Sequence, residues 1–362
     1  MRLLDYRAAV RESVSTTAEL ATYLRERGYD PGEALGEPAE PAVLPLRVPR
    51  YYLDLIDFAD PADPLRRQVL PSAAEREVDP AELADPIGDG AHSPTPGVVH
   101  RYPDRALLLL TAACAVHCRF CFRREFIGQP ARALGPAALE AAYAYLAATP
   151  AIWEVILSGG DPLVLAPRRL KDIVEALAAI EHVKVIRVHT RVPVATPERV
   201  TREVVRALKA SGKATYVVLH ANHPRELTPA ARAACAQFID AGIPMLSQSV
   251  LLRGVNDDAA TLGALMRALV ESRIRPYYLH QGDLARGTEH LRTSIAEGQE
   301  LMRALRGRYS GLCQPTFVLD IPGGHGKVPV GPIYFAPGEK GSSSGLVLDP
   351  AGRRHPYPPT RP

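Results

Sequence analysis

The sequence predicts an α/β fold, a partial (β/α)6 barrel in which parallel strands alternate with helices. Three observations predict it. Short apolar runs alternate with amphipathic stretches from Arg105 onward, these runs lack the polar alternation of a half-exposed strand, and polar residues follow their ends. In a parallel barrel the loops after the carboxyl ends of the strands form the active site. An open doubly wound sheet is the alternative, although no GxGxxG turn follows the first strand.

The chain of 362 residues divides into three predicted regions. Residues 1–98 are rich in proline and turn signals, and we predict an N-terminal extension with short helices such as Tyr6 to Arg27. Residues 99–306 form the predicted barrel core. Residues 307–362 form the predicted C-terminal segment, of which the part from about Pro337 is predicted to be loop or a loosely attached extension.

The elements of the core follow from the spacing of apolar residues. The predicted strands are 105–111, 152–158, 184–190, 215–221, 244–252 and 275–280. The predicted helices lie near 136–148, 168–181, 197–210, 228–241, 258–272 and 287–306. The polar residues at or just past the strand ends include Cys114, Asp161, His189, Arg191, His220, Gln248, His280 and Asp283. A barrel would gather them at one face.

Composition and charge exclude several classes of protein. A hydrophobic fraction of 46% and a charged fraction of 23% are typical of a globular chain. The net charge of +3 comes from basic and acidic residues that are interspersed, so nucleic-acid binding is not expected. No apolar run reaches the roughly 18 residues of a membrane span, and the N-terminus lacks a secretory signal. We therefore expect a cytoplasmic protein with no membrane partner.

Three of the five cysteines form a compact motif. Cys114, Cys118 and Cys121 are spaced C-x3-C-x2-C directly after the first predicted strand. Thiolates ligate iron–sulfur clusters, and three of them would hold a [4Fe–4S] cubane while leaving one iron open. The alternatives are a zinc knuckle that takes His117 as its fourth ligand, and ordinary buried thiols.

This motif resembles that of the radical S-adenosylmethionine (SAM) superfamily, and Phe120 matches its aromatic residue. In that superfamily the open iron binds SAM, and the reduced cluster cleaves it to a 5′-deoxyadenosyl radical. The segment of Ser158, Gly159, Gly160 and Asp161 resembles the Gly-Gly-Glu-type segment that contacts the methionyl amino group. The resemblance implies a TIM-like barrel, both cofactors, and an electron donor such as flavodoxin or ferredoxin.

A second motif, PGGHGK, ends at Lys327. Glycines allow a sharp turn, and a lysine can form a Schiff base with an aldehyde cofactor. The loop resembles that of the lysine 2,3-aminomutases, a branch of the same superfamily, in which this lysine carries pyridoxal 5′-phosphate. The resemblance runs from about Tyr51 to Phe335 and includes RYPDR, LSGGDPL, RVHTRVPV and RPYYLHQGDLARGTEHLRT.

The resemblance implies a cofactor-binding role for further residues. Those of RYPDR would surround the pyridoxal ring and phosphate, and residues near the ends of the third to fifth strands would contact SAM and the migrating centre. The first set is Arg101, Tyr102 and Arg105, and the second is His189, Arg191, His220 and Gln248. For each histidine, a buried and satisfied ring is the structural alternative.

The resemblance also implies a small amino-acid substrate. Arg123 matches the residue that pairs with the substrate α-carboxylate, and Asp283 and Asp320 match two acids that hold the distal amino group of lysine. Two buried acids favour a cationic side chain. We therefore expect conversion of L-lysine to β-lysine, with arginine as the alternative substrate and a non-catalytic iron–sulfur or zinc protein as a remote alternative. The resemblance also allows a homo-oligomer.

Overall fold

The computed structural model describes residues 13–35, 44–129, 133–338 and 344–358, and its largest sheet contains the six predicted strands. Each agrees with its predicted range to within two residues at either end. They are β4 (Arg105–Thr111), β5 (Glu154–Gly159), β6 (Val185–Thr190), β7 (Ala214–His220), β8 (Met245–Val250) and β9 (Arg275–His280).

The order of the strands decides between the two predicted architectures. Neighbouring strands from β4 to β9 pair in parallel and in chain order, without the reversal that defines a doubly wound sheet. The sheet continues into β10 (Thr316–Ile321), which is parallel to β9 and was not among the predicted strands. The fold is thus the expected barrel-like sheet, extended by one parallel strand.

Antiparallel strands form the two edges of this sheet in the described residues. They are β3 (Val98–Tyr102), which pairs with β4, and β11 (Gly326–Pro329), which pairs with β10. The sheet curves until these edges approach, and the Tyr102 hydroxyl accepts a hydrogen bond of 2.7 Å from the backbone N–H of Lys327. A side chain, not a strand ladder, therefore joins the two edges.

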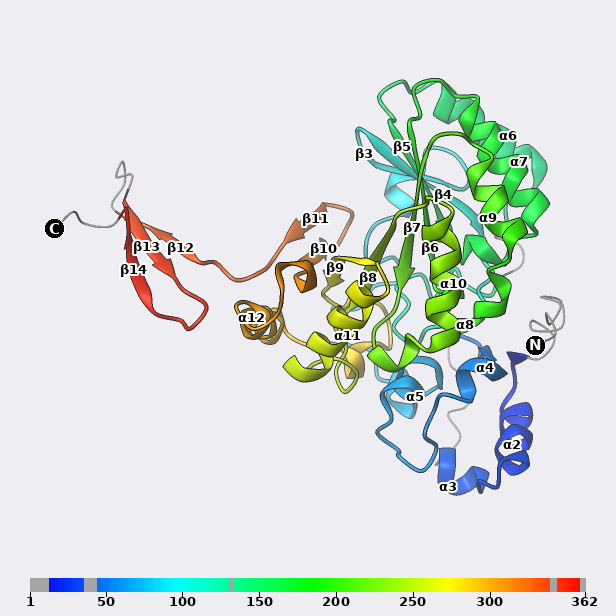
Figure 1. Cartoon of the computed structure of the whole chain (residues 1–362). Helices are drawn as coiled ribbons and strands as arrows, with labels where there is room; N and C mark the ends of the chain where they lie inside the picture. The colour runs from blue at the N-terminus through cyan, green and yellow to red at the C-terminus, as the bar shows by residue number, and fades with distance from the viewer. Residues whose placement is uncertain (1–12, 36–43, 130–132, 339–343, 359–362) are drawn as a thin grey trace.

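Helices cover the outer side of the curved sheet (Figure 1). In α7 the buried residues Leu170, Ile173, Val174 and Leu177 recur at the helical period, so one stripe packs on the sheet. The helices that follow the core strands are α6 (Pro136–Ala147), α7 (Pro167–Ala178), α9 (Arg202–Lys209), α10 (Pro229–Asp240), α11 (Ala259–Glu271) and α12 (Ile295–Leu305).

N-capping side chains explain why two of the predicted core helices begin later than expected. The helix expected at 287–306 begins only at Ile295, because Ser294 and Glu297 form a capping box, and residues 289–291 form a 3₁₀ turn. Thr201 likewise caps α9, so the predicted 197–210 helix is interrupted after a 3₁₀ turn at 197–199.

The predicted helix from Tyr6 to Arg27 is also shorter. Residues 1–12 lie outside the described chain, Ser13–Val14 forms strand β1, paired with β2 (Val48–Pro49), and α2 spans Thr17–Glu26 after a capping box at Thr16. The short helices that follow in this N-terminal region are α3 (Pro31–Leu35), α4 (Arg50–Leu53) and α5 (Pro64–Val69).

The N-terminal region shares its hydrophobic core with the barrel. Tyr23 and Leu24 of α2 belong to the same buried cluster as Phe317 of β10. The division of the chain at residues 98 and 306 stays a prediction. In the described residues no helix is both long and apolar enough to span a bilayer.

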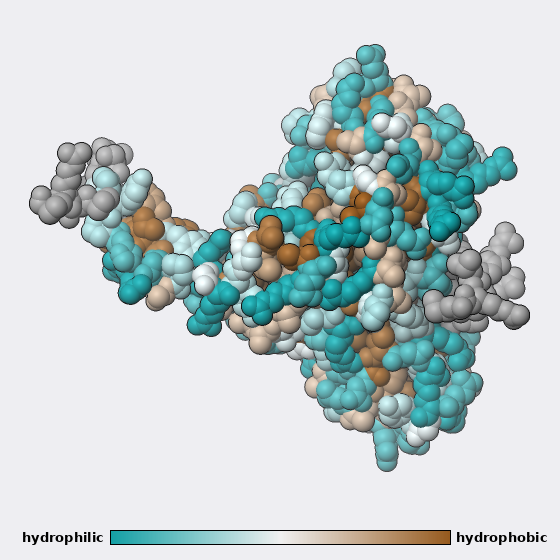
Figure 2. Space-filling view, in the orientation of Figure 1, coloured by the Kyte–Doolittle hydropathy of each residue, from teal (hydrophilic) through white to brown (hydrophobic). Residues whose placement is uncertain are grey.

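The C-terminal stretch, predicted as loop or a loosely attached extension, contains strands, so the loop alternative is wrong and the extension is what the structure shows. Strands β12 (Phe335–Pro337), β13 (Gly345–Leu348) and β14 (Arg354–Tyr357) form an antiparallel sheet that projects from the barrel (Figure 1). Apolar side chains are exposed on this arm (Figure 2). They include Phe335 and Leu346. Each strand is so short that its apolar pattern carries little signal.

A buried ion-pair cluster fixes the loop that carries the cysteines. Glu75 accepts hydrogen bonds from Arg119 (2.8 Å) and Arg124 (2.6 Å), and all three side chains are almost completely buried.

We expect Glu75→Gln to lower the free energy of unfolding by about 3–5 kcal/mol, because two buried guanidinium groups lose their counter-charge. Urea denaturation measures it. Glu203→Gln, in an exposed pair with Arg206, is the control and should leave stability unchanged, and an equal effect of both would contradict this account.

Candidate active site

One cavity of about 830 Å³ brings all the predicted site residues together. Its wall runs along the core strands, from Arg105 and Val185 at their amino ends to Gly159 and His220 at their carboxyl ends. The predicted residues on its wall are Arg101, Tyr102, Arg105, Cys114, Cys118, Cys121, Arg123, Ser158, Gly159, Gly160, Asp161, His189, Arg191, His220, Gln248, Asp283, Asp320 and Lys327.

The three cysteines occupy the loop that follows β4. Burial raises the pKa of Cys121 to about 12 and that of Cys114 well above its ordinary value, so an electropositive ligand is needed to hold these groups as thiolates. In the described chain no three His, Cys, Asp or Glu side chains converge as ligands of one metal ion. A cubane cluster binds each thiolate at a different iron, so the motif fits a cluster better than a zinc knuckle completed by His117.

The Gly-Gly turn packs directly against the start of the cysteine loop. A Cβ at Gly160 would lie 2.2 Å from the carbonyl oxygen of Ala113, so only glycine allows this approach. The Asp161 carboxylate accepts hydrogen bonds from the Thr190 hydroxyl (2.8 Å) and the backbone N–H of Arg191 (2.7 Å). Both of its oxygens are therefore engaged, and Asp161 ties the end of β5 to that of β6.

Three histidines, on strands β6, β7 and β9, present unpaired ring nitrogens. In the described residues the buried Nε2 atoms of His189, His220 and His280 have no hydrogen-bond partner. Burial lowers the pKa of His220 to about 3 and that of His189 well below its ordinary value, so both rings are neutral at pH 7. An unsatisfied buried nitrogen is unfavourable, which favours ligand contacts over the alternative of satisfied core histidines.

Two of the predicted arginines share a carboxylate that the sequence analysis missed. Asp89 lies 2.7 Å from Nε of Arg123 and 3.2 Å from Nη2 of Arg101. It belongs to a turn-rich stretch before β3, where no periodic pattern marks a site. Nη2 of Arg123 is buried and has no partner among the described residues, so it can still bind an anion in the cavity.

Lys327 lies opposite Asp320 in the β10–β11 hairpin. Its Nζ is 2.8 Å from Oδ2 of Asp320 and 3.2 Å from Nδ1 of His280. The loop between the strands requires glycine at Gly324, where φ is +84°. Burial acts to raise the pKa of Asp320, but His280 and Lys327 together hold it well below its ordinary value. His280 was predicted at this strand end but not as a site residue.

Comparison with known proteins gives the family. A model described as the radical SAM superfamily matches residues 108–262, and one described as lysine-2,3-aminomutase matches residues 302–341. The chain is 43% identical to the L-lysine 2,3-aminomutase of Acetoanaerobium sticklandii over 91% of its own length and 79% of that protein. The corresponding enzyme of Clostridium subterminale is also 43% identical, over 91% of this chain and 78% of that protein.

The chain belongs to the lysine 2,3-aminomutase family of radical SAM enzymes. It is therefore a radical SAM aminomutase, an isomerase, and its superfamily implies a [4Fe–4S] cluster and SAM. The glutamate 2,3-aminomutase of Clostridioides difficile is 38% identical over 79% of this chain and 67% of that protein. Family membership alone does not select the substrate.

Around Lys327, the aminomutase cavity combines anion-binding and cation-binding groups. Cζ of Arg105 lies 3.8 Å from the centre of the Tyr102 ring, whose hydroxyl accepts the backbone N–H of Lys327. These three residues and Arg101 suit a phosphorylated aldehyde. Nearby, burial, with a smaller contribution from the charge of Asp320, raises the pKa of Asp283 to about 7. Two acids thus face the same space as the lysine.

Proposed function

We propose that this chain is a pyridoxal phosphate-dependent lysine 2,3-aminomutase, which converts L-lysine to β-lysine. The observation that supports lysine as the substrate is the pair of carboxylates, Asp283 and Asp320, on the cavity wall with Lys327. Relatives named L-lysine 2,3-aminomutase, 43% identical to this chain, support it.

The cofactor sites follow from the residues on the cavity wall. Cys114, Cys118 and Cys121 would hold the cluster, and Lys327 would carry pyridoxal phosphate. The SAM site would be lined by Ser158 to Asp161 with His189, Arg191, His220 and Gln248. When bound, the cluster and SAM supply the 5′-deoxyadenosyl radical, and pyridoxal phosphate carries the amino group that migrates. The chain itself supplies binding, orientation and exclusion of water.

The charges in the cavity match a substrate with a cationic side chain. Nη2 of Arg123 is free to bind the α-carboxylate, which sets the orientation of the amino acid. Above the pKa of Asp283, about 7, Asp283 and Asp320 provide two negative charges for two cations, Nζ of Lys327 and the distal ammonium of lysine. Glutamate would instead place a third carboxylate against them, which is strongly unfavourable in a buried site. A guanidinium also pairs well with two acids, so arginine is the second candidate.

The variant Asp283→Asn tests the proposed selectivity, because it removes one negative charge and keeps the shape of the side chain. We expect kcat/KM for lysine to fall roughly thirty- to a thousandfold, mostly through a higher KM. This corresponds to a loss of about 2–4 kcal/mol of transition-state stabilisation. Cleavage of SAM by the reduced cluster should persist in the variant. Asp172→Asn, on the exposed side of α7, is the matched control and should behave as the wild type. Unchanged lysine kinetics in Asp283→Asn would remove Asp283 from substrate binding.

The raised pKa of Asp283 predicts a pH dependence. Because the pKa is about 7, the carboxyl is neutral below that pH and charged above it. We expect kcat/KM for lysine to fall about tenfold per pH unit below pH 7, since the distal ammonium loses one counter-charge. The pH profile of kcat/KM measures it, and the acid limb should disappear in Asp283→Asn. An identical limb in that variant would assign it to another group.

A further inference from the structure

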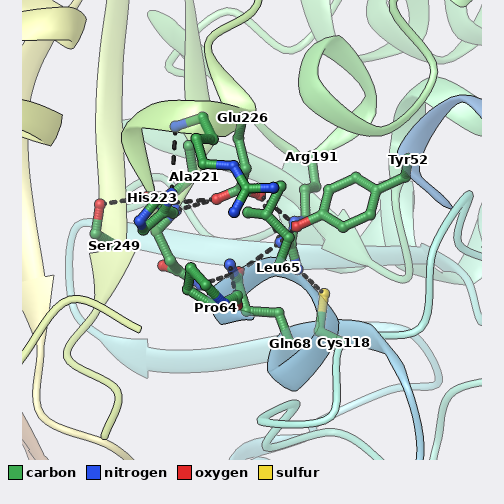
Figure 3. Close-up of polar contacts among 12 residues, drawn as sticks. Tyr52, Pro64, Leu65, Gln68, Cys118, Arg191, Ala221, His223, Glu226 and Ser249 are labelled. Atoms are coloured by element: carbon green, nitrogen blue, oxygen red, sulfur yellow. Dashed lines mark hydrogen bonds and ion pairs between the residues drawn. The ribbon is translucent and has the colours of Figure 1, made fainter. Parts of the chain in front are cut away.

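A buried cation lies against one of the three motif cysteines (Figure 3). Nη1 of Arg191 donates to Sγ of Cys118 over 2.8 Å, and Nη2 lies 2.6 Å from Oε1 of Glu226. Arg191 is 5% exposed and Glu226 is fully buried. The ion pair thus presents its positive end to the sulfur and its negative end away from it.

Groups from the N-terminal region fix the orientation of this guanidinium. Nη2 of Arg191 also lies 2.7 Å from Oε1 of Gln68 and 3.0 Å from the Tyr52 hydroxyl (Figure 3). Glu226 is held in turn, because its second oxygen accepts two backbone N–H hydrogen bonds of 2.7 and 2.9 Å. Both Nη atoms of Arg191 are therefore engaged by the protein, and its buried Nε has no partner among the described residues.

We propose that Arg191 acts through Cys118 as a positioning residue that raises the reduction potential of the cluster. A hydrogen bond from a cation to a ligand sulfur stabilises the reduced cluster, which carries the additional negative charge. Glu226 limits this effect because its carboxylate opposes the field of the guanidinium. The inference rests on the cluster that the family implies and is independent of the substrate proposed above.

Two one-electron transfers depend on the potential of the cluster. A low-potential protein donor of the flavodoxin or ferredoxin class would lose one electron to the bound cluster. The reduced cluster would supply that electron to the sulfonium of SAM, whose C5′–S bond would break to give methionine and the 5′-deoxyadenosyl radical. A higher cluster potential favours the first transfer and reduces the driving force of the second, so the Arg191 contact sets the balance between them.

Two variants should move the potential in opposite directions. In the double variant Arg191→Gln/Glu226→Gln both charges disappear together, and the shorter glutamine cannot reach Sγ, so we expect a shift to more negative potential. In Glu226→Gln alone the guanidinium keeps its contact and loses its counter-charge, so we expect a shift to more positive potential. An anaerobic redox titration of the reconstituted protein, followed by the electron paramagnetic resonance signal of the reduced cluster, measures both.

The double variant Arg206→Gln/Glu203→Gln is the matched control, because it removes both charges of an exposed ion pair on α9 that is not part of the cavity wall. We expect the wild-type potential in this control. Equal potentials in all four proteins, or shifts of the same sign in both test variants, would overturn the proposal. A loss of SAM affinity at an unchanged potential would overturn it as well and assign Arg191 to SAM binding.

Discussion

Replacing Lys327 with alanine is expected to abolish bound pyridoxal phosphate and to reduce lysine turnover by about a thousandfold or more. Among the described residues, Lys327 is the one lysine on the cavity wall, and its Nζ lies 2.8 Å from Asp320. The variant removes the amine without disturbing the cysteine loop, so iron, sulfide and SAM cleavage should stay at wild-type values. The visible absorbance of lysine-bound pyridoxal phosphate, together with product analysis, measures the effect.

The control for this variant is Lys171→Ala, since pyridoxal phosphate also reacts with surface lysines. Lys171 lies on α7 in an exposed pair with Glu175, and its loss should change neither absorbance nor turnover. Retained absorbance and turnover in Lys327→Ala would remove Lys327 from this role.

Replacing Cys121 with alanine is expected to give the converse result. One of three cluster ligands is lost, so we expect iron and sulfide to fall far below four of each per chain and SAM cleavage to cease. Binding of pyridoxal phosphate should remain, because Lys327 lies on a different wall of the cavity. Iron and sulfide analysis and detection of 5′-deoxyadenosine measure the effect.

Cys235→Ala is the matched cysteine control. Cys235 is a fully buried residue of α10 that belongs to the hydrophobic core and is not part of the cavity wall. Its replacement should leave the cluster intact. Normal iron content and SAM cleavage in Cys121→Ala would contradict the assignment of the motif.

The sequence was sufficient to predict the core strands and the site residues near their ends, because both depend on local patterns. Each core strand is a short apolar run, and the carboxyl ends of parallel strands lie at the same edge of the sheet. The positions of Cys114, Asp161 and His220 in one site could therefore be predicted. Helices α9 and α12 begin later than predicted, because the N-capping side chains of Thr201 and Ser294 set their first residues and are not part of the apolar period.

The sequence was insufficient to predict contacts between residues that lie far apart in the chain. Gln68 meets Arg191 across 123 residues, and Asp89 meets Arg123 across 34, and no period connects either pair. These protein partners of Arg191 were not predicted, although its contact with SAM stays a prediction, since its Nε is unpaired in the described residues. The β12–β14 arm escaped prediction because its strands have three or four residues each.

The most direct test of the account is an anaerobic turnover assay of the reconstituted protein. It would contain SAM, pyridoxal phosphate, a strong one-electron reductant and either L-lysine, L-arginine or L-glutamate, with β-amino acids separated by chromatography. We predict β-lysine as the main product and none from glutamate, because Asp283 and Asp320 repel a third carboxylate. Formation of β-glutamate, or cleavage of SAM without β-lysine from lysine, would contradict the account.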